Sequence, residues 1–275
     1  MPAPYGDYPS RREGPVKATL ACGQFAPAAG RLSHNIDRIS SFAQEASARG
    51  AVILVLPELC LCGYPPADKA REWAVRTDGP EMARLADAAR VNAVALCAGF
   101  AELAADGALY NSAAYFDRRG ALRAVYRKVH LWVTEKEWAR PGGSFTTWTD
   151  GGLRMGAWIC YDSRFPEAAR SLARAGTRLA LVGSAWFGPP EEWELAVRAR
   201  AMDNGIFVAG ASVLGTFGST PFRGASLISD PHGRVIAQAE PGVEQLITAA
   251  YDDEAVESCR ARIPLLAHLR PETYG

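Results

Sequence analysis

Three side chains that could take part in chemistry each follow an apolar segment that is predicted to form a β-strand. They are the carboxylate of Glu58, the amine of Lys128 and the thiol of Cys160. Ligands of open α/β folds gather at the carboxyl ends of strands, so residues far apart in the sequence can converge there. Taken singly, a cysteine after a strand is more often a small buried filler, and a lone Glu or Lys is more often solvated. Their shared placement is the reason to group them as one candidate site.

The surroundings of Cys160 favour a nucleophile. A predicted strand over residues 153–159 precedes it, and a predicted helix begins near Pro166. The partial positive charge of a helix N-terminus favours a thiolate. In such a strand-turn-helix unit the backbone N–H of Tyr161 would face the reacting carbon as one donor of an oxyanion hole.

A thiol nucleophile needs a base, and the four histidines offer few candidates. His34 falls in a predicted helix, His232 in a hairpin turn and His268 in the tail, which leaves His130, two residues after Lys128. A carboxylate can serve instead where desolvation raises its proton affinity. The sequence therefore leaves two bases open, His130 and a carboxylate.

The elements that must position these residues alternate between strands and helices. Strands are predicted at residues 16–25, 51–56, 91–100, 153–159, 179–183, 206–211 and 244–250, hairpins at 109–126 and 225–237, and helices beginning near residues 33, 80, 166 and 190. This order predicts an α/β fold with mixed sheets. Residues 204–222 are interpreted as a buried strand followed by a glycine-rich loop. Residues 1–15 are predicted to be a flexible leader and residues 16–275 a single domain.

Composition excludes several classes of protein. The chain has 275 residues with 30 Lys and Arg against 30 Asp and Glu, which argues against the basic surface of a nucleic-acid-binding protein. Its six cysteines are too few for a disulfide scaffold, and Cys60 and Cys62 lack the spacing of a zinc site. We expect no metal, no secretory signal and no membrane span, and therefore a soluble cytoplasmic protein.

Three motifs in fixed order resemble the signature blocks of the nitrilase superfamily of carbon-nitrogen hydrolases. They are Pro57-Glu58 with Gly63-Tyr64, the run Tyr126-Arg127-Lys128-Val129-His130-Leu131, and Cys160-Tyr161-Asp162 with Arg164-Phe165-Pro166-Glu167. The resemblance covers roughly residues 17–272. Three independent motifs in register are far less expected by chance than any one of them.

The resemblance implies a four-layer αββα sandwich with two mixed sheets. It also implies Cys160 as nucleophile, Glu58 as general base and acid, and Lys128 as oxyanion stabiliser. A second glutamate of the family corresponds to Glu135, seven residues after Lys128 and six before Pro141-Gly142. The role implied for Glu135 is to position the substrate and support the leaving amine, whereas a solvated loop carboxylate is the alternative. No cofactor is implied, and a homodimer or higher even oligomer is expected.

The residues after the nucleophile bear on the substrate. True nitrilases of the superfamily carry Trp-Glu there, whereas this chain has Tyr161-Asp162. The difference favours hydrolysis of a small aliphatic amide, with an N-carbamoyl amine or amino acid as the alternative substrate. Tyr64, Tyr161 and Trp186 are candidate pocket residues, or ordinary core. Arg164 either binds a substrate carboxylate or, as favoured, pairs with Glu167 at a helix start.

Three other functions fit the same motifs less well. A nitrilase would differ at the pair after Cys160, and a non-catalytic binding protein on this fold would lack one of Glu58, Lys128 and Cys160. An acyltransferase would keep all three and pass the acyl group to an amine instead of water. The expected partner is a small-molecule amide.

Overall fold

The predicted strands assemble into two six-stranded sheets in the computed structural model, which describes residues 15–274. The first sheet has the order β14-β1-β2-β3-β4-β5 and comprises β1 (Lys17–Gln24), β2 (Ile53–Val55), β3 (Ala95–Leu103), β4 (Leu109–Phe116), β5 (Leu122–Arg127) and β14 (Gln245–Asp252). The second has the order β13-β12-β9-β8-β7-β6 and comprises β6 (Thr147–Asp150), β7 (Leu153–Ile159), β8 (Leu179–Ser184), β9 (Phe207–Ser212), β12 (Leu227–Ser229) and β13 (Val235–Gln238).

The two sheets share one pattern of strand directions. In the first, β1, β2 and β3 are parallel neighbours, and in the second β7, β8 and β9 are. The remaining pairs in both sheets are antiparallel. Each sheet is therefore mixed, as predicted, and each has a parallel centre whose strands end on one edge.

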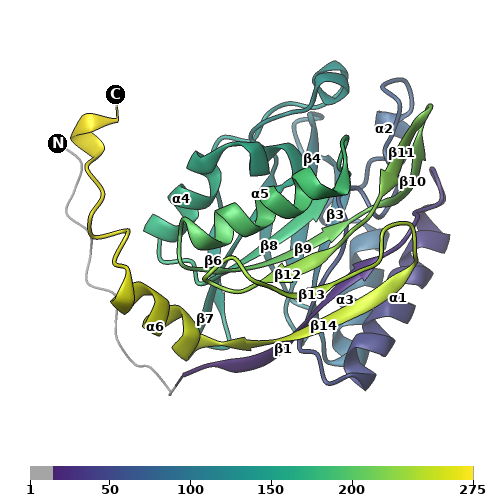
Figure 1. The fold of residues 1–275 in the computed structure, drawn as a ribbon. Helices are drawn as coiled ribbons and strands as arrows, with labels where there is room; N and C mark the ends of the chain where they lie inside the picture. Colours follow the sequence, from purple (N-terminus) through teal and green to yellow (C-terminus); the bar gives the residue numbers. More distant parts are fainter. Residues whose placement is uncertain (1–14, 275) are drawn as a thin grey trace.

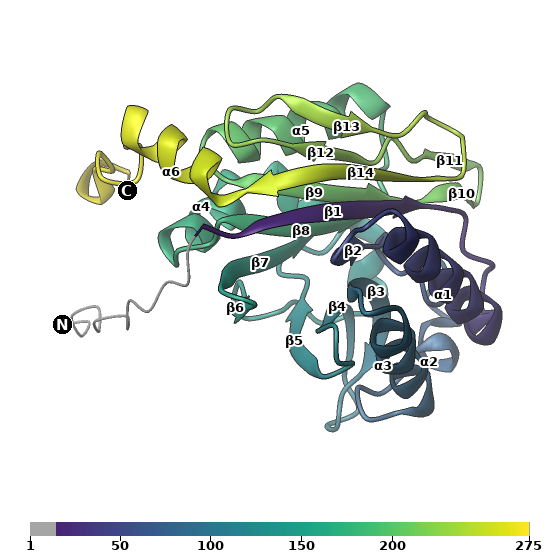
Figure 2. The ribbon, with the colours of Figure 1, turned by 90° about the horizontal axis from the view of Figure 1, so that it is seen from below.

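Helices cover the outer face of each sheet. The long α1 (Leu32–Ala48) and α3 (Pro80–Asn92) lie side by side on the first sheet, and α4 (Pro166–Arg174) and α5 (Pro190–Met202) cover the second (Figures 1 and 2). The short α2 (Ala70–Trp73) follows the β2 loop, and α6 (Asp253–Arg262) extends β14 away from the sheets (Figure 1). The layers run helix, sheet, sheet, helix, which confirms the predicted αββα sandwich.

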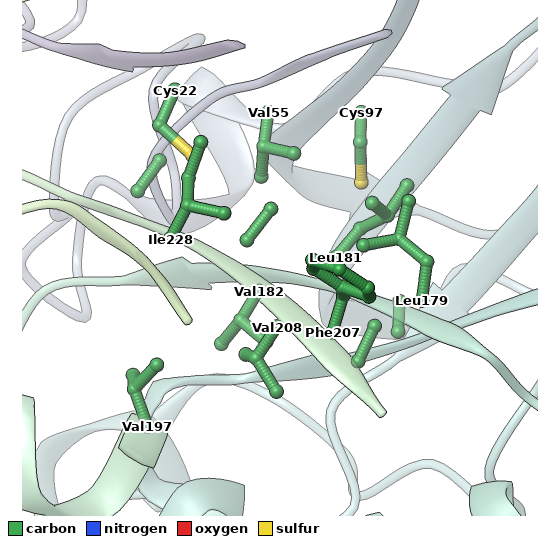
Figure 3. Close-up of a cluster of buried hydrophobic side chains, with 14 of the residues drawn as sticks. Cys22, Val55, Cys97, Leu179, Leu181, Val182, Val197, Phe207, Val208 and Ile228 are labelled. Carbon is green, nitrogen blue, oxygen red and sulfur yellow. The ribbon is translucent and has the colours of Figure 1, made fainter. Parts of the chain in front are cut away.

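The apolar core lies between the two sheets and beneath the helices. Figure 3 shows Cys22, Val55 and Cys97 of the first sheet pointing toward Leu181 and Phe207 of the second. Because side chains alternate along a strand, the neighbouring Val182 and Val208 point the other way, toward α5. Each fully buried side chain of this size contributes about 1.5–3 kcal/mol to folding.

The fold differs from the sequence prediction in several places. Residues 91 and 92, predicted to begin a strand, are the end of α3, and β3 begins only at Ala95; the short α2 was not predicted. The predicted glycine-rich loop after β9 is a hairpin, β10 (Leu214–Phe217) and β11 (Thr220–Arg223), whose turn begins at Gly218 with φ +58°. Such a positive φ suits the two-residue turns that join antiparallel strands. Strand β6 and helix α6 were also missed, since both are short and mainly polar. The predicted leader lies outside the described residues, except for its last position.

The structure also bears on membranes, metals and disulfides. Within residues 15–274 no helix is long and apolar enough to cross a membrane. In the same range no group of three or more His, Cys, Asp and Glu side chains could hold a metal ion. All six cysteines are free and buried.

Candidate active site

Glu58 lies on a loop whose backbone packs closely against one strand of each sheet. The loop follows β2, and two glycines face it, Gly99 in β3 and Gly183 in β8. A Cβ on Gly99 would lie 2.5 Å from the backbone nitrogen of Leu59, and one on Gly183 would lie 2.8 Å from that of Glu58. Both separations are shorter than any ordinary contact. Residues without side chains at these two positions therefore allow the carboxylate to enter the interior.

Glu58, Lys128 and Glu135 meet in a fully buried cluster. The Lys128 Nζ donates to Glu58 Oε1 at 2.6 Å and to Glu135 Oε1 at 2.7 Å. Asn111 in β4 donates its Nδ2 to the same two oxygens at 2.7 and 3.0 Å. The second oxygen of Glu58 accepts the backbone N–H of Ala185 at 2.6 Å. One ammonium and one amide thus bridge two carboxylates away from water.

Burial and mutual charge set the proton affinities in this cluster. Burial, reinforced by the charge of Glu135 and opposed by Lys128, raises the pKa of Glu58 to about 7. Burial also opposes ionisation of Glu135, but the adjacent ammonium outweighs it and lowers the pKa of this carboxyl. For Lys128 burial is outweighed by the two carboxylates, which raise its pKa well above the usual value. Glu58 is therefore the member of the cluster whose pKa lies near neutral pH.

Cys160 begins a short 3₁₀ helix, Cys160–Arg164, directly after β7. Its φ is +43°, a conformation that residues other than glycine rarely adopt and that persists only where the surroundings enforce it. The Sγ lies 3.5 Å from the carbonyl oxygen of Ala185, whose N–H binds Glu58. The thiol and the base are thus joined through one residue.

The expected lowering of the Cys160 pKa by a helix N-terminus is wrong. Burial, together with the charge of Glu58, raises the pKa of the thiol. The 3₁₀ helix also separates Cys160 from α4, which begins at Pro166. The raised pKa keeps the thiol protonated at neutral pH.

The family follows from comparison with known sequences. The family model for carbon-nitrogen hydrolases matches residues 19–261. The chain belongs to the carbon-nitrogen hydrolase family. Its relatives include human omega-amidase NIT2, 34% identical with 88% of this chain and 92% of the relative covered. Another is 2-oxoglutaramate amidase of Bacillus subtilis, 31% identical with 94% and 100% covered.

Solved structures agree with this assignment. An amidase from Nesterenkonia sp. AN1 superposes with a TM-score of 0.82 at 27% identity, covering 93% of this chain and 94% of that one. That structure holds the acetamide moiety of fluoroacetamide, added covalently to the active-site cysteine. Because its family hydrolyses carbon-nitrogen bonds and these relatives are amidases, this carbon-nitrogen hydrolase is of the amidase type and acts on non-peptide C–N bonds.

The three predicted pocket residues of this carbon-nitrogen hydrolase lie in different surroundings. The Tyr64 hydroxyl donates to Glu135 Oε1 at 3.0 Å, and its ring packs on Phe187. Tyr161 is partly exposed and packs edge-on against Trp132. Trp186 is buried against Trp193 of α5. A substrate contact of each stays a prediction.

Arg164 has a structural partner, but not the predicted one. Its guanidinium forms an ion pair with Glu192 of α5 rather than with Glu167, and lies 4.7 Å from the ring centre of Trp186. Glu192 is 28 residues further along the chain, and no local pattern could have indicated it.

His130 is held by a second buried carboxylate. Its Nδ1 lies 2.8 Å from Asp162 Oδ1, and its ring stacks on Phe165 at 3.6 Å. Asp162 also accepts the backbone N–H groups of His130 at 2.9 Å and Ile159 at 3.0 Å, and the Tyr126 hydroxyl at 2.7 Å. His130 therefore belongs to the hydrogen-bond network around Asp162, whereas Glu58 is the carboxylate linked to the Cys160 thiol through Ala185.

Several residues of the site were missed from sequence. Asn111 lies inside β4 and gave no signal, because polar residues on strands are common. Trp132 and Phe187 stack at 5.6 Å beside the cluster, and both follow predicted motif residues closely enough that position could have suggested them. Glu137, two residues after Glu135, is in contrast exposed.

A cavity of about 640 Å³ opens at the other ends of the strands. It is lined by the first residues of β1, β2, β3 and β7, together with arginines 118, 119 and 123. None of the predicted catalytic residues lines it. The candidate active site is therefore the buried cluster at the carboxyl ends of these strands.

Proposed function

We propose that this protein hydrolyses a small aliphatic amide to a carboxylic acid and ammonia through a thioester on Cys160. The observation that carries the proposal is the buried cluster of Glu58, Lys128 and Glu135, joined to the thiol through Ala185. A base whose pKa lies near 7, beside a thiol that is protonated at rest, suits nucleophilic attack at neutral pH.

In the first half of the reaction, Cys160 Sγ attacks the amide carbon while Glu58 takes the thiol proton. The carbonyl oxygen becomes an oxyanion, held by Lys128 Nζ and the backbone N–H of Tyr161. The C–N bond then breaks, and Glu58 returns the proton to the departing nitrogen, so that ammonia leaves. The acyl group stays on the sulfur as a thioester.

In the second half, Glu58 takes a proton from water, and the oxygen attacks the thioester carbon. The C–S bond breaks, the sulfur regains the proton, and the carboxylic acid leaves. Glu135 stays ionised, because Lys128 lowers its pKa, and supports the ammonium and the leaving amine. The reaction as written requires only the amide and water.

A second candidate substrate is the monoamide of a dicarboxylic acid. It is favoured by the similarity to proteins named omega-amidase and 2-oxoglutaramate amidase. An N-carbamoyl amino acid is less well supported, because Arg164, the residue proposed to bind its carboxylate, already pairs with Glu192.

Intact-mass measurement after brief exposure to butyramide tests the proposal. We expect one butyryl group on the protein and release of ammonia. The Cys160→Ala variant, with an unchanged melting temperature, should show neither. Hydrolysis of butyramide by Cys160→Ala would overturn the assignment. Preferred formation of the hydroxamate in the presence of hydroxylamine would point to acyl transfer instead.

We also propose that the chain acts in the cytoplasm as a homodimer or a higher even oligomer. The family resemblance supports this assembly. Analytical ultracentrifugation is expected to give a multiple of the 29.5 kDa chain mass, and a clean monomer would contradict it.

A further inference from the structure

Asn111 is a fully buried amide at the third position of β4. Both hydrogen bonds of its Nδ2 go to carboxylate oxygens, at 2.7 Å to Glu58 and at 3.0 Å to Glu135. Within residues 15–274 its Oδ1 has no hydrogen-bond partner. Burying a polar oxygen without a partner lowers stability, and an apolar residue of the same size would avoid this cost. The amide is therefore placed for the two carboxylates and not for the strand.

The backbone of Asn111 also holds the third charged member of the cluster. Its carbonyl oxygen accepts the backbone N–H of Lys128 at 2.8 Å, which continues the antiparallel pairing of β4 with β5. Glu58, Lys128 and Glu135 all lie outside the strands. A strand residue that contacts all three therefore fixes where they meet.

A neutral donor suits a cluster in which two carboxylates share one ammonium. Burial raises the pKa of Glu58 to about 7, and the Lys128 ammonium and the Asn111 hydrogen bond oppose it, because both favour the ionised carboxyl. A second ammonium in place of the amide would hold Glu58 ionised and make it a poor proton donor. An apolar side chain would leave it largely protonated and make it a poor base.

The pH dependence of a reaction at this site reports on Glu58. The titratable groups that face Glu58 belong to four residues: Tyr64, Lys128, Glu135 and Cys160. Burial raises the pKa of the hydroxyl and of the thiol, so both stay protonated. For the ammonium, burial is outweighed by the carboxylates, which raise its pKa, and for the second carboxyl it is outweighed by the ammonium, which lowers its pKa, so both stay ionised. His130 pairs with Asp162 instead.

We propose that Asn111 is a positioning residue for the general base: its amide holds Glu58 and Glu135 against one ammonium and favours the carboxylate form of Glu58. The proposal rests on the proposed role of Glu58 in the hydrolysis and names the residue that adjusts this base. Asn111 acts through the carboxylates and not on the substrate.

Asn111→Leu tests the proposal, because leucine keeps the size of the side chain and donates no hydrogen bond. Loss of the donor raises the pKa of Glu58, so the midpoint of the pH profile of kcat/KM for butyramide is expected to rise by about one pH unit. A smaller fraction of Glu58 is then ionised at pH 7, and kcat/KM should fall about 5-fold there and return toward the wild-type value above about pH 9. Asn111→Ala, which adds no bulk, should move the midpoint in the same direction. An unchanged midpoint in either variant, once shown to be folded, would overturn the proposal.

Ser112→Ala is the matched control. Ser112 follows Asn111 in β4, is equally buried, and its hydroxyl donates to the buried carboxylate of Glu102 at 2.6 Å. Because side chains alternate along a strand, Ser112 points to the face of the sheet opposite that of Asn111. Its loss should lower the melting temperature and leave the pH midpoint near 7. An equal rise of the midpoint in Ser112→Ala would contradict a specific role of Asn111.

Alkylation by iodoacetamide gives a readout that does not require hydrolysis. The Cys160 sulfur displaces iodide from carbon while Glu58 takes the thiol proton, so the alkylation rate should have the same pH midpoint as kcat/KM. Intact mass measures the added carboxamidomethyl group, and Cys160→Ala gives the contribution of the other cysteines.

The two readouts separate this proposal from the proposed function. A raised alkylation midpoint in Asn111→Leu, with no hydrolysis of any amide by the wild-type protein, would retain the role of Asn111 and overturn the hydrolysis. Normal hydrolysis with both midpoints near 7 in the Asn111 variants would overturn the role of Asn111 alone. A wild-type Cys160 that reacts with neither iodoacetamide nor butyramide would overturn both.

Discussion

Two buried carboxylates lie beside the Cys160 turn, and their partners differ. Glu58 accepts from the Lys128 ammonium, the Asn111 amide and the Ala185 backbone N–H. Asp162 accepts from a hydroxyl, an imidazole nitrogen and two backbone N–H groups, which come from the end of β5, the loop after it and the end of β7.

The different hydrogen-bond partners of Glu58 and Asp162 fit two different roles in the proposed reaction. Glu58 shares its ammonium with Glu135, and burial raises its pKa to about 7, so it can give and take a proton. Asp162 ties three chain segments together and reaches back to the residue before Cys160, where a carboxylate satisfies a free N–H at a helix start. It holds the backbone at which Cys160 takes its positive φ. This contrast supports the proposed roles, proton transfer for Glu58 and positioning of the Cys160 backbone for Asp162.

Glu58→Gln is expected to have the largest effect. The amide cannot take the thiol proton or protonate the leaving nitrogen, so kcat should fall by about 10²–10⁴. Single-turnover kinetics with butyramide would check this. As a control, Glu137→Gln changes an exposed carboxylate near the cluster and should keep normal kcat. Near-normal turnover in Glu58→Gln would remove Glu58 as the base and make the comparison with Asp162 meaningless.

Asp162→Asn is expected to lower kcat/KM by about 100-fold, because a misplaced nucleophile reacts slowly. The asparagine NH₂ would face donors such as the Ile159 N–H, and each orphaned buried donor costs about 1–3 kcal/mol of the free energy of unfolding. Kinetics and thermal unfolding would measure both effects. A large loss of stability with unchanged kcat would show that Asp162 supports the fold but not the position of Cys160.

The pH profile distinguishes the two carboxylates. Because Glu58 must be ionised to act as base and its pKa is raised to about 7, kcat/KM should fall about 10-fold per pH unit below that value. The midpoint should remain near 7 in Asp162→Asn, whose residual activity still depends on Glu58. A midpoint that moved by a full unit in this variant would mean that Asp162 contributes to the titration.

The sequence reveals the proposed catalytic residues better than the residues that hold them in place. Glu58, Lys128 and Cys160 follow strands and lie in recognisable motifs, and the structure brings the first two together with Glu135. Asn111 sits in the middle of a strand, where nothing local marks it. Its role exists only because β4 carries it beneath two carboxylates that lie 53 and 24 residues away in sequence.

The β10–β11 hairpin was not predicted from the sequence, and the reason differs from that for Asn111. Glycines at 215 and 218 suggested a loop, since glycine interrupts strands, yet both take a positive φ that helps the ribbon to turn and twist. Phe217 and Phe222 were the available signal, because two rings in a loop need somewhere to pack. Their partners, Tyr64 and Phe187, come from distant loops, so the contact could only be seen in the fold.

Tyr126→Phe is the mildest way to weaken the Asp162 arrangement. It removes one of four donors to the carboxylate and leaves the Val129 N–H without its partner at 3.3 Å, while the ring still packs in place. The loss of one such hydrogen bond costs about 1 kcal/mol, and we expect kcat to fall about 5-fold with no change of the pH midpoint. Combining Tyr126→Phe with Asp162→Asn should add little to the effect of Asp162→Asn alone, because the hydroxyl acts through the carboxylate. Additive losses would show instead that Tyr126 supports the site by an independent route, and that Asp162 is not the point at which the three segments are joined.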